Sequence, residues 1–477
     1  MNTIVTENLI SFKELEEKIF SYVCELGREL TQQMLERYDN ELMKGRDTRQ
    51  YRSKGGRSTS IKTVYGEVSY SRNVYETRTD AGKKAYVYLL DEALSMDKIG
   101  LISTNLAEKI AETVTEAPYR ATAEMISSTC GQSLSHGGVW NLIQQLGGRI
   151  AEEEKVAVSE MNAEQPRGSA AVPVLFEEMD GVWLRMQGKD RKRMKKQEMK
   201  VSVMYEGWEK DGKRNSRLSN KAVLAGMEKS DEFHEKREAQ IHRRYNPDEI
   251  GLRILNGDGG SWIKDPYDAD AVFQLDRFHI YQEIRRKISD KEAGKRIREL
   301  LEQEKIEELL EYIQIYATSV ESPDEKDQTS SKAMELYSYL RNNKEGLLPY
   351  QSRGLKIPEA PDHLVYKGMG VQENQNCTTI TLRMKHRRMR WSTSGANNMA
   401  KVLYTKENRE LSQTIERYTD SLLFAVEMEE ILQTLSAAKA PKKDGKGSPY
   451  GERIRHPMPL LDAMQTESRK AFKRAFR

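Results

Sequence analysis

The stretch that decides the fold lies between residues 172 and 276 and contains five apolar runs. They read VPVLFEEMD (172–180), MKVSVMYEGW (199–208), NKAVLAGM (220–227), GLRILNGD (251–258) and DAVFQLD (270–276). Short runs rich in valine, leucine and isoleucine, bounded by glycine and polar residues, predict β-strands. A helical stretch from Ser230 to Tyr245 separates the third run from the fourth. We therefore predict an α/β core that begins near residue 172.

The order of these elements is three strands, a helix, a strand, a helix and a strand, which is the order of the RNase H-like fold. Residues 281–341 are rich in acids and bases at helical spacing and contain no strand signal. We interpret them as an all-helical insertion into the core. Strand and helix signals resume near Leu364, so the core is expected to close after the insertion.

The residues before the core predict an α+β region. Residues 12–44 repeat apolar side chains at helical spacing, and residues 51–78 alternate apolar and polar side chains, which indicates a β-hairpin after a chain break at Gly55 and Gly56. Residues 103–148 suggest two short helices, a turn and a third helix beginning near Ser135, the shape of a helix-turn-helix. Any small helical bundle offers the same pattern, so DNA recognition and simple packing both stay open here.

The whole chain divides in this interpretation into eight segments: an N-terminal helix (1–50), a small β-rich DNA-contact region (51–100), a helix-turn-helix (101–150), a linker (151–171), the first part of the core (172–280), the helical insertion (281–360), the second part of the core (361–435) and a basic segment (436–477).

Composition and cysteine spacing indicate whether the chain spans a membrane and in which compartment we expect it. The 477 residues contain no run of 18 apolar residues, which excludes a membrane-spanning helix. The N-terminal residues lack a signal-peptide pattern, and Cys24, Cys130 and Cys377 form no metal or disulfide spacing, so we expect a cytoplasmic protein.

Net charge is small, with 77 Lys and Arg against 74 Asp and Glu, but bases gather locally. Residues 185–200 carry eight bases against two acids, and residues 439–477 carry eleven against four. Such clusters are either solvated segments or phosphate-binding surfaces.

Two aspartates carry the chemistry that we expect. Asp180 and Asp258 each end an apolar run and precede glycine, which predicts carboxylates at the rim of the sheet with space for a ligand. One Asp-Gly pair alone is more often a turn. Two at equivalent strand ends predict a site for two Mg²⁺ ions, about 3.5–4 Å apart, that activate the attacking oxygen and stabilise the leaving one.

A third carboxylate is expected beyond the insertion. Glu373 is the first acid after Asp362, while Glu177, Glu178 and Glu283 are alternatives. Bases and an aromatic residue follow Glu373 and predict a surface for a phosphodiester substrate. The expected DNA-binding residues are Arg57, Lys62, Arg191, Lys192, Arg193, Lys195, Lys196, Arg383, Lys385, Arg387, Arg388 and Arg390.

The motifs VYGEVSYSRNVY, LNGDGG, LDRFH and RMKHRRMRW, with a three-strand block that contains an Asp-Gly, resemble insertion-sequence transposases of the ISLre type, relatives of the Mutator-like superfamily. The resemblance covers residues 62–403. It implies an RNase H-like core, Mg²⁺ or Mn²⁺ as cofactor, and binding to the terminal inverted repeats of the element and to target DNA. By the same resemblance Asp180, Asp258 and Glu373 match the catalytic acids, and a homo-oligomer assembles on DNA.

Asp276 and His279 match a Cys/Asp-x-x-His feature of the Mutator-like enzymes; as an alternative, they form a hydrogen-bonded pair that caps a helix starting near Arg277. The resemblance departs at residues 392–401, STSGANNMAK, where some relatives place the glutamate and this chain has no acid. The expected function is a DNA transposase that cleaves and rejoins strands. The alternatives are a structure-selective nuclease and a non-catalytic DNA-binding regulator.

Overall fold

The computed structural model describes residues 11–79, 82–94, 102–163, 168–210, 217–264, 271–321 and 328–419. The chain divides into two compact units. The first contains residues 1–114, 119–139 and 415–477, and the second contains residues 115–118 and 140–414. Among the helices described, none is long and apolar enough to span a membrane. The basic segment predicted at 436–477 lies outside the described residues.

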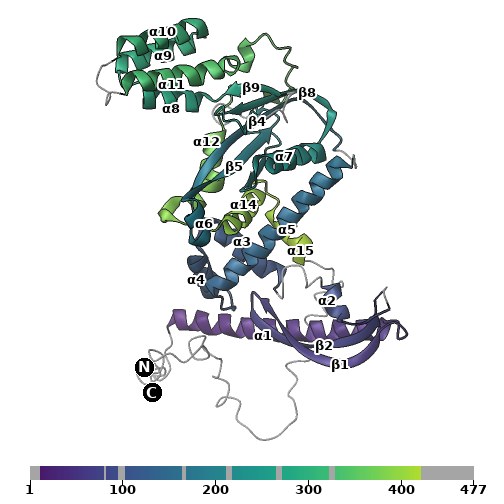
Figure 1. The fold of residues 1–477 in the computed structure, drawn as a ribbon. Helices are drawn as coiled ribbons and strands as arrows, with labels where there is room; N and C mark the ends of the chain where they lie inside the picture. Colours follow the sequence, from purple (N-terminus) through teal and green to yellow (C-terminus); the bar gives the residue numbers. More distant parts are fainter. Residues whose placement is uncertain are drawn as a thin grey trace, which may run out of the picture. The chain divides into compact units, whose positions relative to one another are not determined.

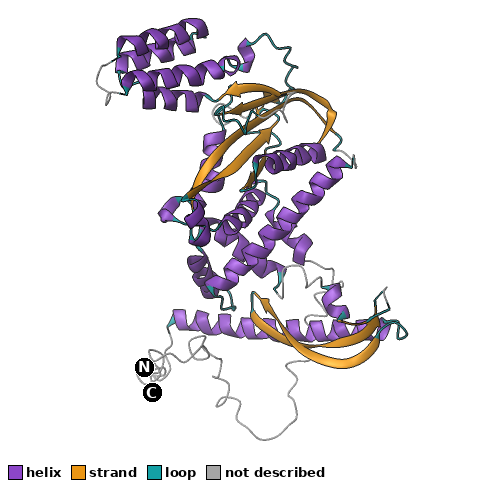
Figure 2. Cartoon of the chain, in the orientation of Figure 1, coloured by secondary structure: helices purple, strands orange, loops and turns teal. Residues whose placement is uncertain are grey.

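The first unit begins with the predicted long helix. Helix α1 (Phe12–Gly45) starts at a capping box, in which Ser11 and Glu14 each bond the other's backbone N–H. A three-stranded antiparallel sheet follows, made of β1 (Arg52–Thr63), β2 (Gly66–Arg78) and β3 (Lys84–Val87), and the short helix α2 (Leu89–Ala93) comes after it. Figure 2 shows these strands alongside α1. The hairpin predicted at 51–78 is confirmed.

The expected chain break at Gly55 and Gly56 is wrong. Both residues lie inside β1, where the pairing with β2 shifts register between Ser53 and Gly56. Gly55 has a φ of 89°, a left-handed value that glycine adopts without steric cost. The two glycines therefore make a β-bulge within a continuous strand.

Three helices occupy the predicted helix-turn-helix region: α3 (Thr104–Glu116), α4 (Tyr119–Thr129) and α5 (His136–Asn162). The third begins one residue after the expected Ser135. It continues to Asn162, into the stretch 151–171 that the sequence suggested as a linker, and β4 already begins at Ala170. Glu154 within this stretch is ion-paired with buried Lys236 and Lys401, so this part of α5 packs as part of the second unit.

The second unit is built on a mixed five-stranded sheet with the order β7-β5-β4-β8-β9. Its strands are β4 (Ala170–Arg185), β5 (Lys196–Tyr205), β7 (Ala222–Gly226), β8 (Tyr245–Gly257) and β9 (Ala271–Leu275). β7, β5 and β4 pair antiparallel, whereas β4, β8 and β9 pair parallel. All five strands and helix α7 (Ser230–Arg244) occur where the sequence predicts them, so the mixed α/β class is confirmed (Figure 1). The helix expected between the fourth and fifth strands is not found in the residues described between them, 258–264, which form turns.

A buried ionic network holds α5 and α7 to α14 (Thr393–Glu407). Lys401 is fully buried, and its Nζ lies 2.9 Å from Glu154 and 2.8 Å from Glu228. Lys236 reaches the same two glutamates at 3.1 and 2.6 Å. Tyr404 donates a hydrogen bond to Glu154 (2.6 Å). Because each buried charge is paired, the network joins three helices that are distant in sequence.

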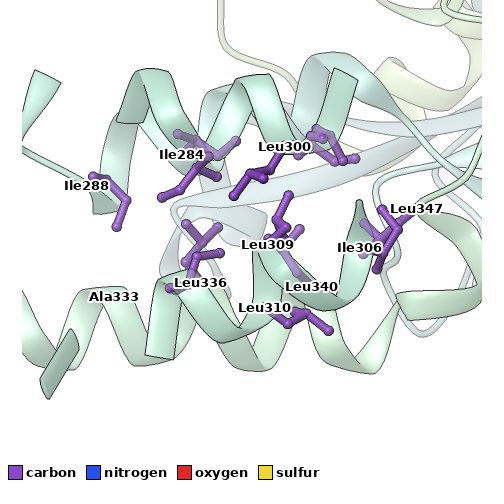
Figure 3. Packing of buried hydrophobic residues seen from close by; sticks show 14 of the residues in the cluster. Ile284, Ile288, Leu300, Ile306, Leu309, Leu310, Ala333, Leu336, Leu340 and Leu347 are labelled. Carbon is purple, nitrogen blue, oxygen red and sulfur yellow. The ribbon is translucent and has the colours of Figure 1, made fainter. Parts of the chain in front are cut away.

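The predicted insertion is helical. It consists of α8 (Arg277–Lys287), α9 (Lys291–Glu302), α10 (Ile306–Ser319) and α11 (Thr329–Asn342), which lie together beyond β9 in Figure 1. Figure 3 shows their shared apolar interior, in which leucine and isoleucine side chains from all four helices meet. This insertion therefore has a hydrophobic core of its own.

Shorter elements complete the second unit: α6 (Gly188–Arg193), β6 (Trp208–Glu209), two 3₁₀ turns (Lys344–Gly346 and Tyr350–Ser352), β10 (Leu364–Val365), α12 (Gln372–Gln375), a π-helical stretch (Asn376–Thr381), α13 (Leu382–Met384), a 3₁₀ turn (His386–Arg388) and the start of α15 (Leu411–Thr419). β6 and β10 form a separate two-stranded pair. The elements from α12 to α13 form one continuous helical segment after the insertion.

Candidate active site

Asp180 and Asp258 lie side by side in the sheet: Asp180 is on β4, and Asp258 directly follows the last residue of the neighbouring parallel strand β8. The last partners in this pair are Met179 and Gly257, and the two aspartates are the next residues on each strand. Parallel strands lie about 4.8 Å apart, so the two backbones are adjacent at this level. Asp258 lies at the end of its strand, as predicted. Asp180 does not, because β4 continues to Arg185 and pairs there with β5.

Asp180 is held by three groups from different parts of the chain. Its side chain accepts hydrogen bonds from the N–H of Gly181 (2.7 Å) and from Nδ2 of Asn376 (2.6 Å), and its Oδ2 lies 3.6 Å from Nε2 of His279. Asp180 is 7% exposed. The orientation of its carboxylate is therefore fixed, and little of the residue is exposed to solvent.

Asp258 is more open and is fixed through its backbone. Its Oδ1 accepts from the N–H of Gly260 (2.7 Å), and its carbonyl oxygen accepts from the hydroxyl of Tyr339 on α11 (2.8 Å). The helical insertion thus contacts the strand end that presents this aspartate.

Asp276 and His279 lie beside the two aspartates. Asp276 caps α8 and accepts from the N–H of Phe278 (3.0 Å), as the capping alternative expected. Burial raises its pKa. Burial alone would lower the pKa of His279, but the carboxylates of Asp180, Asp276 and Asp258 raise it to about 9. His279 is therefore protonated at neutral pH and is a cation among three acids.

Glu373 lies on α12, one helical turn before the Asn376 that bonds Asp180. Its side chain is exposed, whereas the neighbouring Gln372, Gln375 and Asn376 are buried. The structure therefore places Glu373 on the helix that contacts Asp180, on its solvent-facing side. No local signal identifies Asn376 as the partner of Asp180, because 196 residues separate the two in the sequence.

The three alternative acids have other partners. Glu177 is fully buried and is ion-paired with Arg253 (2.7 Å) and Arg237 (3.3 Å). Glu178 is also fully buried and accepts hydrogen bonds from Tyr205 (2.6 Å) and from the backbone of residues 370–372, which anchors the start of α12. Glu283 is paired with Arg286 (2.7 Å) and Lys287 (3.3 Å). These bonds give each of them a structural role.

Glu198 on β5 is an acid near the pair that the sequence analysis missed. Burial raises its pKa, and the charges of Asp258 and Asp180 raise it further. Its carboxylate lies over Gly181, where any Cβ would collide with it. It pairs with Trp183 and so projects from the face of the sheet opposite to Asp180. Glu198 therefore adds negative charge near Asp180 and Asp258 from the opposite face of the sheet.

The donor set suits a hard cation. Asp180, Asp258 and Asp276 supply carboxylate oxygens, the ligands that Mg²⁺ prefers, and the charges of all three act on protonated His279. Within the described ranges no group of three His, Cys, Asp or Glu side chains is gathered closely enough to hold a metal ion. The structure therefore brings Asp180 and Asp258 to neighbouring strands, but among the described residues it gathers no third acid with them.

The expected DNA-binding residues lie on several exposed elements. Those on β1 and on α6 and its flank are all exposed: Arg57, Lys62, Arg191, Lys192, Arg193, Lys195 and Lys196. Lys385, Arg388 and Arg390 are exposed after α13, and the side chain of Arg387 lies outside the described part. Arg383 contradicts the expectation, because it is 4% exposed and its guanidinium packs 5.5 Å from the Trp391 ring centre. The Trp391 face attracts the Arg383 guanidinium, which is therefore packed inside the protein.

Comparison with known proteins gives one family. The model of UPF0236, described as an uncharacterised protein family, matches residues 5–418. A UPF0236 protein encoded in the vanSb 3′ region of Streptococcus gallolyticus is 25% identical over 459 residues, which cover 92% of this chain and 95% of the relative. Two relatives from Caldanaerobacter subterraneus subsp. tengcongensis are each 24% identical; the alignments cover 85% of this chain and 79% and 78% of the relatives. The name of the second carries eleven gene designations from that organism.

Proposed function

This chain belongs to the uncharacterised protein family UPF0236, and on that premise we propose that it is a metal-dependent DNA transposase that cleaves the ends of an insertion sequence and joins them to target DNA. The observation that carries the proposal is the adjacency of Asp180 and Asp258 on parallel strands, next to the helix that bears Glu373. Such a set of acids matches the two-metal chemistry of phosphodiester transfer.

The sheet supports an RNase H-like core. Its order, β7-β5-β4-β8-β9, with three antiparallel strands followed by two parallel ones, is the order expected of that fold. The first aspartate lies on the central strand β4 and the second at the end of the neighbouring β8. The helical insertion lies between β9 and α12, where the helical spacing of residues 281–341 predicts it.

A relative's name adds a second line of support. One protein name with eleven gene designations in a single organism indicates that nearly the same gene is present many times. A gene that moves its own DNA leaves such copies. A transposase explains that pattern better than a single-copy nuclease or regulator does.

In the proposed reaction, Asp180, Asp258 and Glu373 would hold Mg²⁺ or Mn²⁺, which would supply Lewis-acid activation of the phosphodiester. Asn376 and protonated His279 orient Asp180. The exposed bases of β1, α6 and the segment after α13 bind phosphates of the inverted repeats and of the target. A homo-oligomer would bring the two element ends together.

The test is a nicking and joining assay with purified protein and a labelled duplex that carries a candidate element end. We expect nicks in Mg²⁺ that are absent in EDTA, and joined product when target DNA is added. Nicks without joined product would indicate a nuclease. Binding without nicks in either metal would indicate a regulator and would refute the proposal.

A further inference from the structure

A cavity of about 720 Å³ lies beside the candidate active site, between the β8–β9 edge of the sheet and the end of α11. We call it the α11 pocket. Four of its lining side chains are cationic, namely Lys264, Arg341, Lys344 and Arg353, and one, Glu345, is anionic. Its charge therefore favours an anionic ligand.

Arg353 has a donor that the protein does not use. Its Nε donates to the carbonyl of Leu348 (2.8 Å) and its Nη1 to the carbonyl of Phe273 (2.6 Å). Its Nη2 is buried and has no hydrogen-bond partner among the described residues. A buried guanidinium donor without an acceptor is costly, so a ligand oxygen in the pocket would stabilise it.

Asn343 presents the complementary group. It is 5% exposed, its Nδ2 donates to the carbonyl of Tyr339 (2.8 Å), and its Oδ1 is a buried acceptor without a partner in the described chain. The pocket thus offers one unused donor and one unused acceptor. A phosphodiester of the DNA backbone has no donor and would use Arg353 alone, whereas a nucleobase or sugar carries donors for the acceptor as well.

One wall of the pocket is apolar and aromatic. Ile263, Val272 and Phe273 line it, and the Nζ of Lys264 lies 4.9 Å from the centre of the Phe273 ring. A ring flanked by a cation is the kind of surface on which nucleic-acid bases stack. The size of the pocket lies in the range of small-molecule sites, well above that of a lone phosphate.

The pocket wall is joined directly to Asp258. Tyr339 donates its hydroxyl hydrogen to the Asp258 carbonyl (2.8 Å), and a Cβ on Gly259 would come within 2.7 Å of Asn343 Oδ1. Gly259 has a φ of 82°, so this close approach depends on glycine. The lining residue Asn343 therefore lies against Gly259, the residue that follows Asp258.

We propose that the α11 pocket binds a single nucleotide of the DNA strand that reaches Asp258, with its phosphate on the cationic side chains and its base against Phe273. This inference rests on the proposed function, because it assumes that DNA passes the aspartate pair. It assigns to the helical insertion a role in holding the strand beside the site of cleavage.

The first test measures binding without cleavage. Full-length protein and the Arg341→Ala/Lys344→Ala variant are titrated with a labelled 12-nucleotide single strand in EDTA. The double variant should bind about tenfold more weakly, and the slope of log affinity against log salt should become shallower by roughly 0.7 for each phosphate that is no longer neutralised. The control, Lys295→Ala/Arg296→Ala, removes two bases of α9 that pair with Glu299, away from the pocket, and should bind as wild type. Equal affinities and salt slopes for all three proteins would overturn the proposal.

The second test identifies the ligand by competition and crosslinking. Deoxyadenosine monophosphate should displace the labelled strand at concentrations where inorganic phosphate does not; equal displacement by phosphate would mean an anion site and would overturn the proposal. A strand with 5-iododeoxyuridine should crosslink to the peptide that contains Phe273, and Phe273→Leu should reduce this crosslink while the folded signal in circular dichroism is retained. Since neither test reads cleavage, failure of the pocket and failure of the transposase reaction are separate outcomes.

Discussion

Asn376 donates a hydrogen bond across 2.6 Å to Oδ2 of Asp180, although 196 residues separate them in the sequence. This bond joins the helical segment after the insertion to the central strand of the sheet. Glu373 lies one turn earlier on the same segment, on its solvent-facing side. The position of the helix that bears Glu373 therefore depends in part on the bond between Asn376 and Asp180.

Asp180→Asn and Asp258→Asn should each reduce nicking to the background rate, because each removes a negative metal ligand and leaves the shape of the site. Binding of end-containing duplex should stay near wild type, since the aspartates hold ions and not phosphates. Gel-based nicking and fluorescence anisotropy measure the two properties. Asp362→Asn, an exposed acid, is the control, and retained nicking in either site variant would contradict the assignment.

Glu373→Gln should lower nicking in Mg²⁺ by orders of magnitude and recover part of it in Mn²⁺, which binds more readily to an incomplete oxygen shell. Glu198→Gln should have a much smaller effect, because Glu198 projects from the opposite face of the sheet. Single-turnover rates in both metals give the comparison. If the Glu198 variant is the more impaired of the two, Glu198 takes the place of Glu373.

Replacing Arg191, Lys192 and Arg193 of α6 by glutamine should weaken binding to any duplex, and the slope of log affinity against log salt should become shallower by about 0.9 for each phosphate that is no longer neutralised. These side chains are exposed at the connection between β4 and β5. Anisotropy titrations between low and moderate salt measure the slope. An unchanged slope would show that this surface does not touch DNA.

Arg383→Ala should destabilise the protein by about 1–3 kcal/mol, because it removes a buried guanidinium that packs on Trp391. Lys385→Ala, two residues away and exposed, should leave stability unchanged and weaken DNA binding. Urea unfolding and anisotropy separate the two effects. The reverse pattern would restore Arg383 as a DNA contact.

Glu228→Gln should destabilise the second unit by about 3 kcal/mol at neutral pH, because it removes one of the two buried carboxylates that Lys236 and Lys401 share and leaves Glu154 to balance both lysines. Burial tends to raise the pKa of Glu228, but the two lysines lower it to about 2. A lowered carboxyl pKa adds stability that is complete above about pH 4.5 and lost as pH falls toward 2. The difference in urea stability between wild type and variant should therefore shrink below pH 4.5.

Glu232→Gln is the matched control, since Glu232 also pairs with Lys236 (3.0 Å) but its side chain is 47% exposed. It should cost less than about 1 kcal/mol at any pH. A destabilisation equal to that of the Glu228 variant would mean that burial does not set the strength of this network.

Local pattern was enough to predict most elements. The five strands of the core, helix α7, the long helix α1 and the helical insertion follow from apolar periodicity, which each segment carries within itself. Errors arose where a local signal has two structural meanings. Gly55 and Gly56 make a bulge in place of a break, and Asp180 precedes a glycine that clears space for Glu198 without ending the strand.

The sequence by itself determined the mixed α/β class, the strand order along the chain and the candidacy of Asp180, Asp258 and Glu373, because these depend on residue type and spacing. Only the tertiary structure decided which groups meet: Asn376 and His279 at Asp180, Lys401 and Lys236 at two buried glutamates, and Arg383 on Trp391. The physical reason is that these partners lie far apart in the sequence or depend on burial, and both are fixed only when the helices pack on the sheet.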